Sequence, residues 1–155
     1  MQEFKEFSNG DIDQRLSRLV KSERKITHLV LQHIAEVHRR RIFLDFGYAS
    51  TFEYLTARHG YCESSAYRRL QAAQVFMRDP EVGAKLENGK INLTQMSKVE
   101  QCLKQQVKAG KKMLDAIQIG AVIEALEDKS LLETSRILSR RATSASCWYI
   151  LRRSL

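Results

Sequence analysis

Arginine is the residue type whose placement most clearly suggests a chemical role in this chain of 155 residues. Residues 39–78 hold seven arginines and three acidic residues, which gives this stretch a net charge of +4. A guanidinium group donates two parallel hydrogen bonds that fit a phosphate or the edge of guanine. The predicted contact residues are Arg39, Arg40, Arg41, Arg58, Ser64, Ser65, Tyr67, Arg68 and Arg69. They predict binding to a nucleic acid.

The rest of the chain does not share this excess of positive charge. The formal net charge is +8, yet residues 1–38 hold six basic and six acidic residues, and residues 79–139 hold nine of each. The remaining charge of +4 comes from Arg140, Arg141, Arg152 and Arg153. The alternative interpretations are that the arginines form a solvated face, or that residues 39–41 only complement the dipole of a helix end.

Residues that could catalyse a reaction or bind a metal are not grouped in the sequence. His28, His33 and His38 are spaced by five residues, which turns a helix by about 500° and directs the imidazoles away from one another. Cys62, Cys102 and Cys147 are far apart and form no C-x-x-C pair. There is no Gly-rich phosphate loop and no paired nucleophile and base. The sequence therefore predicts no cofactor, no metal and no enzyme activity.

A helix-turn-helix-like hairpin is predicted at residues 50–78 to position these arginines. Ser50 and Glu53 form a capping box, and Gly60 suits a turn that needs a positive φ. The second helix, residues 63–78, is predicted to enter the major groove with Arg68 and Arg69 both exposed. Its inward face is predicted to carry Ala66, Leu70, Ala73 and Met77. An ordinary corner between two helices is the alternative interpretation.

A long first helix is predicted to begin near Ser8, Asn9 or Asp11, and nothing in its pattern interrupts it before Gly47. Apolar residues recur at helical or heptad spacing along it, namely Ile12, Leu16, Leu19, Ile26, Val30 and Val37. A helix of about 30 residues is about 45 Å long, which exceeds what a small domain covers. We therefore predict a homodimer through this helix. A break near residues 21–25, giving two shorter helices, is the alternative.

Composition predicts that the whole domain is all-α, with several helices. One Pro and seven Gly are few for an all-β fold, and hydrophobic residues make up 43% of the chain. Further helices are predicted to begin at Asp79, Asn92, near Met113 and at Ser130, the last through a capping box with Glu133. The pattern ends at residue 139, so we expect one domain at residues 1–139 and a basic, loosely packed tail at residues 140–155.

The sequence contains no apolar run long enough for a membrane span and no apolar signal-peptide core near residue 1. We therefore expect a cytoplasmic protein without a membrane partner.

The run F-G-Y-A-S-T-F-E-Y-L-T-A-R-H-G-Y-C-E-S-S-A-Y-R-R-L-Q-A-A, with the later K-L-E-N-G and I-N-L, resembles a known family. It is similar to the helical domain that precedes the nuclease in a group of bacterial HNH endonuclease proteins. The resemblance covers most of residues 10–139. The residues that fit the recurring pattern are Gly47, Tyr48, Ser50, Phe52, Tyr54, Gly60, Tyr61, Ala66, Tyr67, Arg68, Arg69, Pro80 and Gly89.

Two departures from the family limit what this resemblance implies. Cys62 stands where the family usually has Ser, and the sequence has no H-N-H constellation. The resemblance therefore implies a DNA-contacting accessory module without nuclease activity. Our leading hypothesis is a non-catalytic module that binds double-stranded DNA. The alternative is a protein-interaction or dimerisation module that regulates a partner nuclease or transcription without touching DNA.

Overall fold

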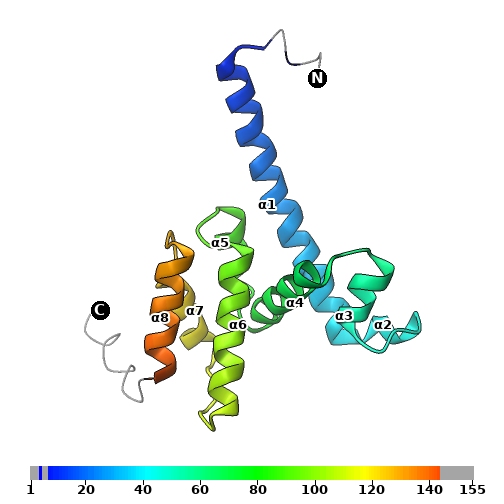
Figure 1. Cartoon of the computed structure of the whole chain (residues 1–155), viewed down its shortest axis with the longest axis vertical. Helices are drawn as coiled ribbons and strands as arrows, with labels where there is room; N and C mark the ends of the chain where they lie inside the picture. Colours follow the sequence, from blue (N-terminus) through cyan, green and yellow to red (C-terminus); the bar gives the residue numbers. More distant parts are fainter. Residues whose placement is uncertain (1–3, 5–6, 144–155) are drawn as a thin grey trace.

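The computed structural model describes residue 4 and residues 7–143, and this part of the chain is all-α, as predicted (Figure 1). A π-helical turn, Tyr54–Arg58, directly follows α3. The α-helices are α1 (Asn9–Arg40), α2 (Ile42–Asp45), α3 (Thr51–Glu53), α4 (Glu63–Arg78), α5 (Val82–Glu87), α6 (Leu93–Lys108), α7 (Ala116–Glu124) and α8 (Leu131–Thr143). Within the described residues, no helix combines the length and apolarity needed to cross a membrane.

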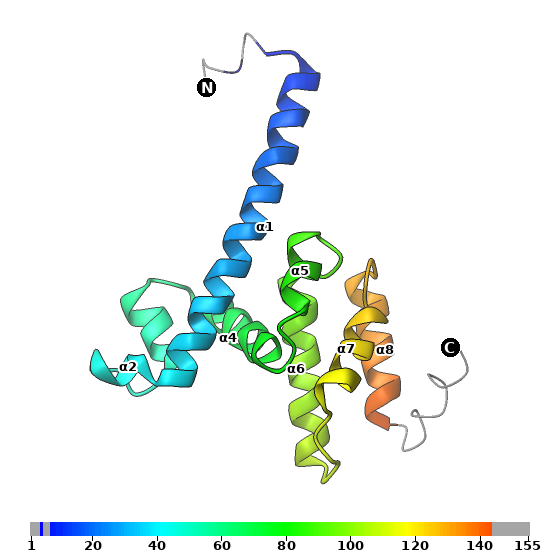
Figure 2. The same ribbon diagram turned by 180° about the vertical axis from the view of Figure 1, so that it is seen from behind.

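Helix α1 is one continuous helix of 32 residues, about 48 Å long, without the alternative break. It begins with a capping box in which the Asp11 amide donates to Ser8 Oγ over 3.2 Å. It ends at Arg41, whose φ of 57° turns the chain into α2. Its buried residues, Leu31, Ile34 and Ala35, all lie in the C-terminal third. The N-terminal part projects from the body (Figures 1 and 2), and we call residues 9–26 the arm.

The hairpin at residues 50–78 forms, but its first helix is irregular. Ser50 Oγ accepts from the Glu53 amide over 3.1 Å, whereas the Glu53 carboxylate bonds the amide of Ala49 instead of Ser50. Only half of the predicted capping box is therefore present. After three α-helical residues the backbone continues as the π-helical turn, and Gly60 reverses the chain with a φ of +68°. The positive φ explains why glycine stands there.

Helix α4 is the central helix of the body. Ala66, Gln71, Ala72, Ala73 and Val75 are buried, and the helix packs on both α1 and α6. The predicted inward face is wrong at Met77, which is 41% exposed. Neighbouring helices also cover the side of α4 that carries Ala72 and Val75. The buried face of α4 is therefore displaced from the predicted row that runs from Ala66 through Ala73, and residue 77, at the end of that row, lies outside the core.

The later helices begin at the predicted caps at Asn92 and Ser130, whereas α5, α7 and α8 differ from the prediction in extent. Asn92 with Gln95 and Ser130 with Glu133 form capping boxes at α6 and α8. Asp79 Oδ1 accepts from the Glu81 amide over 3.1 Å, so it stabilises a turn before α5 and the helix itself begins at Val82.

Helix α7 begins at Ala116, after the predicted start near Met113, because Asp115 caps its first turn. Helix α8 reaches Thr143, beyond the predicted end of the pattern at residue 139, because Leu138 is buried and holds the last turns on the body. The rest of the predicted tail, residues 144–155, lies outside the described residues.

Candidate nucleic-acid interface

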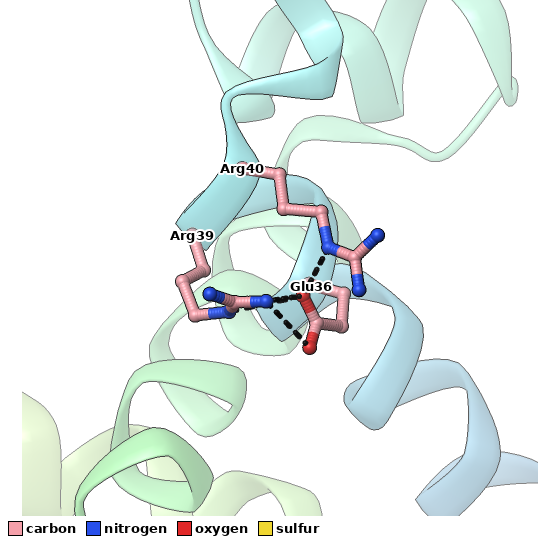
Figure 3. A network of polar contacts seen from close by, with 3 residues as sticks. All are labelled: Glu36, Arg39 and Arg40. Carbon is pink, nitrogen blue, oxygen red and sulfur yellow. Dashed lines mark hydrogen bonds and ion pairs between the residues drawn. The ribbon is translucent and has the colours of Figure 1, made fainter.

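Arg39 and Arg40 meet at one carboxylate at the end of α1 (Figure 3). Arg39 Nη2 lies 2.8 Å from Glu36 Oε2, and Arg40 Nε lies 2.9 Å from the same oxygen. The hydrogen bond from Arg39 is the main reason that the pKa of Glu36 lies below its ordinary value. Two guanidinium groups and one carboxylate leave an excess of one positive charge. All three side chains are exposed, so this charge faces solvent.

Arg41 and Arg58 hold the next two predicted positions. Arg41 ends α1 in the left-handed conformation, and its amide donates to His38 O. The guanidinium carbon of Arg58 lies 4.1 Å from the centre of the Phe46 ring, which places the cation on an aromatic face. Arg58 is nevertheless exposed, and the in-plane N–H groups of a stacked guanidinium remain able to donate.

The first two turns of α4 present Ser64, Tyr67 and Arg68 to solvent, together with the acidic Glu63. Arg68 Nε donates to the backbone oxygen of Ser64 over 3.2 Å, which directs the guanidinium along the start of the helix. Cys62 occupies the N-cap position, but its Sγ makes no capping hydrogen bond and instead lies 3.6 Å from Ser64 Oγ. Tyr67 is 44% exposed and is not part of the core.

The prediction that Arg68 and Arg69 are both exposed is wrong for Arg69, which is half-buried. Its guanidinium carbon lies 4.5 Å from the centre of the Tyr61 ring, and its Nη1 bonds Ser65 Oγ. One residue turns a helix by about 100°, so Arg69 lies on the flank of α4 that faces α1. The Gly60 turn brings the Tyr61 ring to this flank, and Ser65 is half-buried with it.

A groove of about 360 Å³ separates this flank from α1. Its walls come from the arm and the next turn of α1 on one side and from the hairpin on the other. The lining residues are Leu19, Ser22, Glu23, Ile26, Thr27, Val30, Tyr61 and Arg69. The sequence analysis did not predict this groove. The only signal for it is Glu23, which interrupts the apolar stripe of α1 and lines the groove.

The middle of helix α4 is buried, and exposed side chains lie in its first two turns and at Met77 near its end. From Gln71 to Val75 most side chains are buried against α1 and α6. The predicted major-groove segment, residues 63–78, is therefore limited to its first two turns.

The three histidines of α1 each have a different partner. His28 Nδ1 lies 2.5 Å from Glu87 Oε1, His33 Nδ1 lies 2.7 Å from Leu29 O, and His38 Nδ1 lies 2.9 Å from Thr51 Oγ1. Within the part of the chain that the structure describes, no three His, Cys, Asp or Glu side chains gather as a metal site would require.

Comparisons of the chain with protein-family models, curated proteins and solved structures found no match. The function is therefore inferred from the arrangement of the chain's own residues.

Proposed function

We propose that this chain is a non-catalytic helical module that binds double-stranded DNA and acts as a homodimer through α1. The DNA surface consists of Ser64, Tyr67 and Arg68 on the first two turns of α4. The other arginines of the surface, which contact phosphates, are Arg39, Arg40, Arg41 and Arg58. The residues that fit the HNH-family pattern support a relationship to the accessory domain of those nucleases.

The observation that carries this proposal is the exposure of the first two turns of a helix whose middle is buried. Because α4 is packed between α1 and α6 from Gln71 onward, its first two turns are held rigidly while Arg68 faces solvent. Rigid elements position contacting groups more accurately than loops do. A helix N-terminus also favours phosphate, through its free amides and its dipole.

A mobility-shift titration of duplex DNA at two salt concentrations tests the proposal. If Arg68 contacts a phosphate, Arg68→Ala weakens binding to all sequences alike and lowers the salt slope by about one. Arg136→Ala is the matched control, because it removes the same charge from an exposed position on α8, across α6 from α4 (Figure 1). Equal affinity of Arg68→Ala, Arg136→Ala and the unmodified chain would refute the DNA surface.

Exposed apolar residues on the arm support the homodimer. Leu19 is 66% exposed, and Leu16 and Ile26 on the same side are also exposed. Sedimentation at micromolar concentration should give a dimer, which Leu19→Glu converts to a monomer. Leu132→Glu on α8 is the control, because Leu132 is 62% exposed and lies outside the arm. A monomeric unmodified chain would refute the homodimer.

The same exposed arm favours a second candidate function, a protein-interaction module that regulates a partner nuclease or transcription without contacting DNA. Dimerisation with no measurable DNA binding at low salt would favour this candidate. Under both proposals, we expect no DNA cleavage by the purified chain with Mg²⁺, Mn²⁺ or Zn²⁺.

A further inference from the structure

The charged residues of the later helices are separated along the sequence. Residues 79–139 hold nine basic and nine acidic residues, but residues 101–119 contain four lysines and one acidic residue, whereas residues 120–133 contain one lysine and four acidic residues. A neutral total therefore hides a positive stretch that is followed by a negative one.

The fold places these two stretches at opposite ends of α6. Gln95, in the first turn of α6, donates to the backbone oxygen of Leu126 over 3.0 Å, so the negative stretch lies at the start of this helix. Lys85 and Lys90 pair with its carboxylates there. Helix α6 has 16 residues and is about 24 Å long, so the lysines at its other end are well separated from these carboxylates.

The end of α6, the following loop and the start of α7 form a surface that we call the basic tip, residues 107–117. Its α6 side is closed by the Lys111 amide, which donates to Gln106 O over 3.0 Å, with Gly110 at a φ of +75°. Its α7 side is closed by the capping box of Asp115. Both views place the tip at the end of the body opposite the arm (Figures 1 and 2).

The fold leaves the apolar side chains of the basic tip uncovered. Ile117 is 85% exposed, more than any other large hydrophobic residue that the structure describes, and Met113 is 60% and Val107 48% exposed. The opposite side of α7 already fills the core with Val122 and Ile123. Exposed apolar groups that lie close together mark an interaction surface.

Lysines lie among these apolar residues. Lys108 and Lys112 are exposed, and Lys111 is half-buried. The dipole of α6 accounts for Lys108, in the last turn of the helix, but Lys111 and Lys112 lie beyond the helix end. With three lysines and one acidic residue, Asp115, the basic tip has a net charge of +2.

A bilayer that contains anionic lipid fits this combination of side chains. Its negative surface potential attracts lysines, whose aliphatic stems lie along the apolar boundary. Exposed apolar side chains gain free energy when they are buried at the level of the headgroups. The phosphates of DNA attract lysines as well, but they offer nothing to Met113 and Ile117. The apolar residues therefore favour lipid as the ligand of the basic tip.

We propose that the basic tip binds the surface of bilayers that contain anionic lipid, with Met113 and Ile117 buried at the headgroup level and the three lysines beside the phosphates. A contact of this kind needs no membrane-spanning helix. It departs from the expectation of no membrane partner, which rested on spanning and signal segments alone. The inference goes beyond the proposed function and does not depend on the DNA surface, which lies on α4 and the arginines near it.

Sedimentation of the full chain with vesicles tests this inference. We expect binding at low salt to vesicles of phosphatidylcholine mixed with phosphatidylserine, and little binding to phosphatidylcholine alone. Lys108→Gln/Lys112→Gln should lower the partition coefficient roughly 30-fold, because each lysine near an anionic surface contributes a factor of about five. Lys129→Gln/Arg136→Gln is the control, because it removes the same charge from exposed positions outside the basic tip.

Ile117→Ser separates insertion from adsorption by charge alone. It should lower the partition coefficient about tenfold, because the apolar side chain is lost from the buried contact. Leu132→Ser is the matched control, because Leu132 is 62% exposed on α8 and lies outside the basic tip. Urea unfolding checks that both variants retain the fold, and a mobility shift should give the DNA affinity of the unmodified chain for Ile117→Ser.

Other results would overturn the inference. Absence of vesicle binding, or equal binding with and without phosphatidylserine, would refute the contact with anionic lipid. A loss with the lysine variant but none with Ile117→Ser would refute insertion, and an equal loss of DNA affinity in the lysine variant would make DNA the ligand of the basic tip. Arg68→Ala should bind vesicles as the unmodified chain does, so failure of the DNA surface and failure of this inference are distinguishable.

Discussion

Arg68 and Arg69 are adjacent in the sequence but serve different surfaces of α4. Arg68 is exposed and bonds the backbone of Ser64 over 3.2 Å, whereas Arg69 stacks on Tyr61 at 4.5 Å and lines the groove beside α1. A step of about 100° along the helix produces this separation. Charge removal at the two positions should therefore have separable effects.

We predict that Arg69→Ala leaves DNA affinity, measured per chain on a short duplex, close to that of the unmodified chain. Loss of the contact with Tyr61 should lower the free energy of unfolding by about 0.5–1 kcal/mol. Arg68→Ala is the matched control, with weaker DNA binding and unchanged stability. Urea unfolding and mobility shift measure these quantities. The same loss of DNA affinity in both variants would contradict the division of roles.

Gly83→Ala should destabilise the fold by about 1–3 kcal/mol, measured by urea unfolding. A Cβ at Gly83 would overlap the imidazole ring of His28. That ring cannot move freely, because Nδ1 donates to Glu87 over 2.5 Å and Nε2 accepts from Gln32 over 3.1 Å. The substitution therefore pushes α5 away from α1.

Gly120→Ala is the control for that substitution. Gly120 is also inside a helix, but its added Cβ would meet only Asp79 Oδ2, at an ordinary 3.6 Å. This variant should be unchanged or more stable by about 0.5–1 kcal/mol, because alanine favours the helix. Equal stability changes at Gly83 and Gly120 would mean that the contact with His28 does not restrict residue 83.

The free energy of unfolding of Glu100→Gln should increase relative to that of the unmodified chain as the pH rises above about 4.5. Glu100 is fully buried in α6; its Oε1 accepts from Arg78 over 3.1 Å, and its Oε2 has no partner among the described residues. Burial raises the pKa of Glu100 above its ordinary value, and Arg78 and Lys104 oppose this only in part. The stability that this raised pKa provides is fully present below the unfolded value of 4.5 and is lost as the pH rises through the folded value.

Urea unfolding of Glu100→Gln and the unmodified chain across this pH range measures the difference. Glu133→Gln on α8 is a control of opposite sign, because the Ser130 amide lowers the pKa of Glu133. Stability from Glu133 is present above its unfolded pKa and is lost as the pH falls through the folded value. A difference for Glu100→Gln that does not change with pH would contradict the expectation.

Cys62→Ser should stabilise the chain by about 1 kcal/mol, because serine is a strong N-cap residue. Cys62 has the extended backbone of an N-cap, with φ −62° and ψ 151°, but its Sγ lies 3.6 Å from Ser64 Oγ and makes no capping hydrogen bond. Chemical denaturation measures the gain. Cys102→Ser, which places a hydroxyl in the core, should lower stability and serves as the comparison. A loss of stability at both positions would show that residue 62 does not cap α4.

The sequence correctly predicted those helix boundaries that are formed by contacts between residues close together in the chain. The caps at Ser8, Asn92 and Ser130 depend on groups three residues away, and the positive φ of Gly60 depends on the absence of a side chain. Spacing along α1 likewise indicated one long helix. These features need no knowledge of distant parts of the chain.

The features that the sequence did not predict depend on partners far along the chain. Arg69 turns toward the body because Tyr61 and α1 form a wall there, and Met77 emerges because α6 covers the other side of α4. The π-helical turn at Tyr54–Arg58 departs from the regular period that the pattern assumed. At the candidate DNA surface, the residue types alone indicated that the arginines bind DNA. Which arginines face solvent and which face the groove beside α1 is decided by packing.

The arm has a consequence for how helix content responds to concentration. Each of residues 9–19 is exposed, so this segment gains little from tertiary packing, and an isolated helix of about 12–15 residues is only marginally stable in water. In a dilute, solitary chain the first turns should therefore fray and exchange their amide hydrogens rapidly. Association would stabilise the helix over this fraying end. Folding of the arm and binding of a second copy would then be coupled.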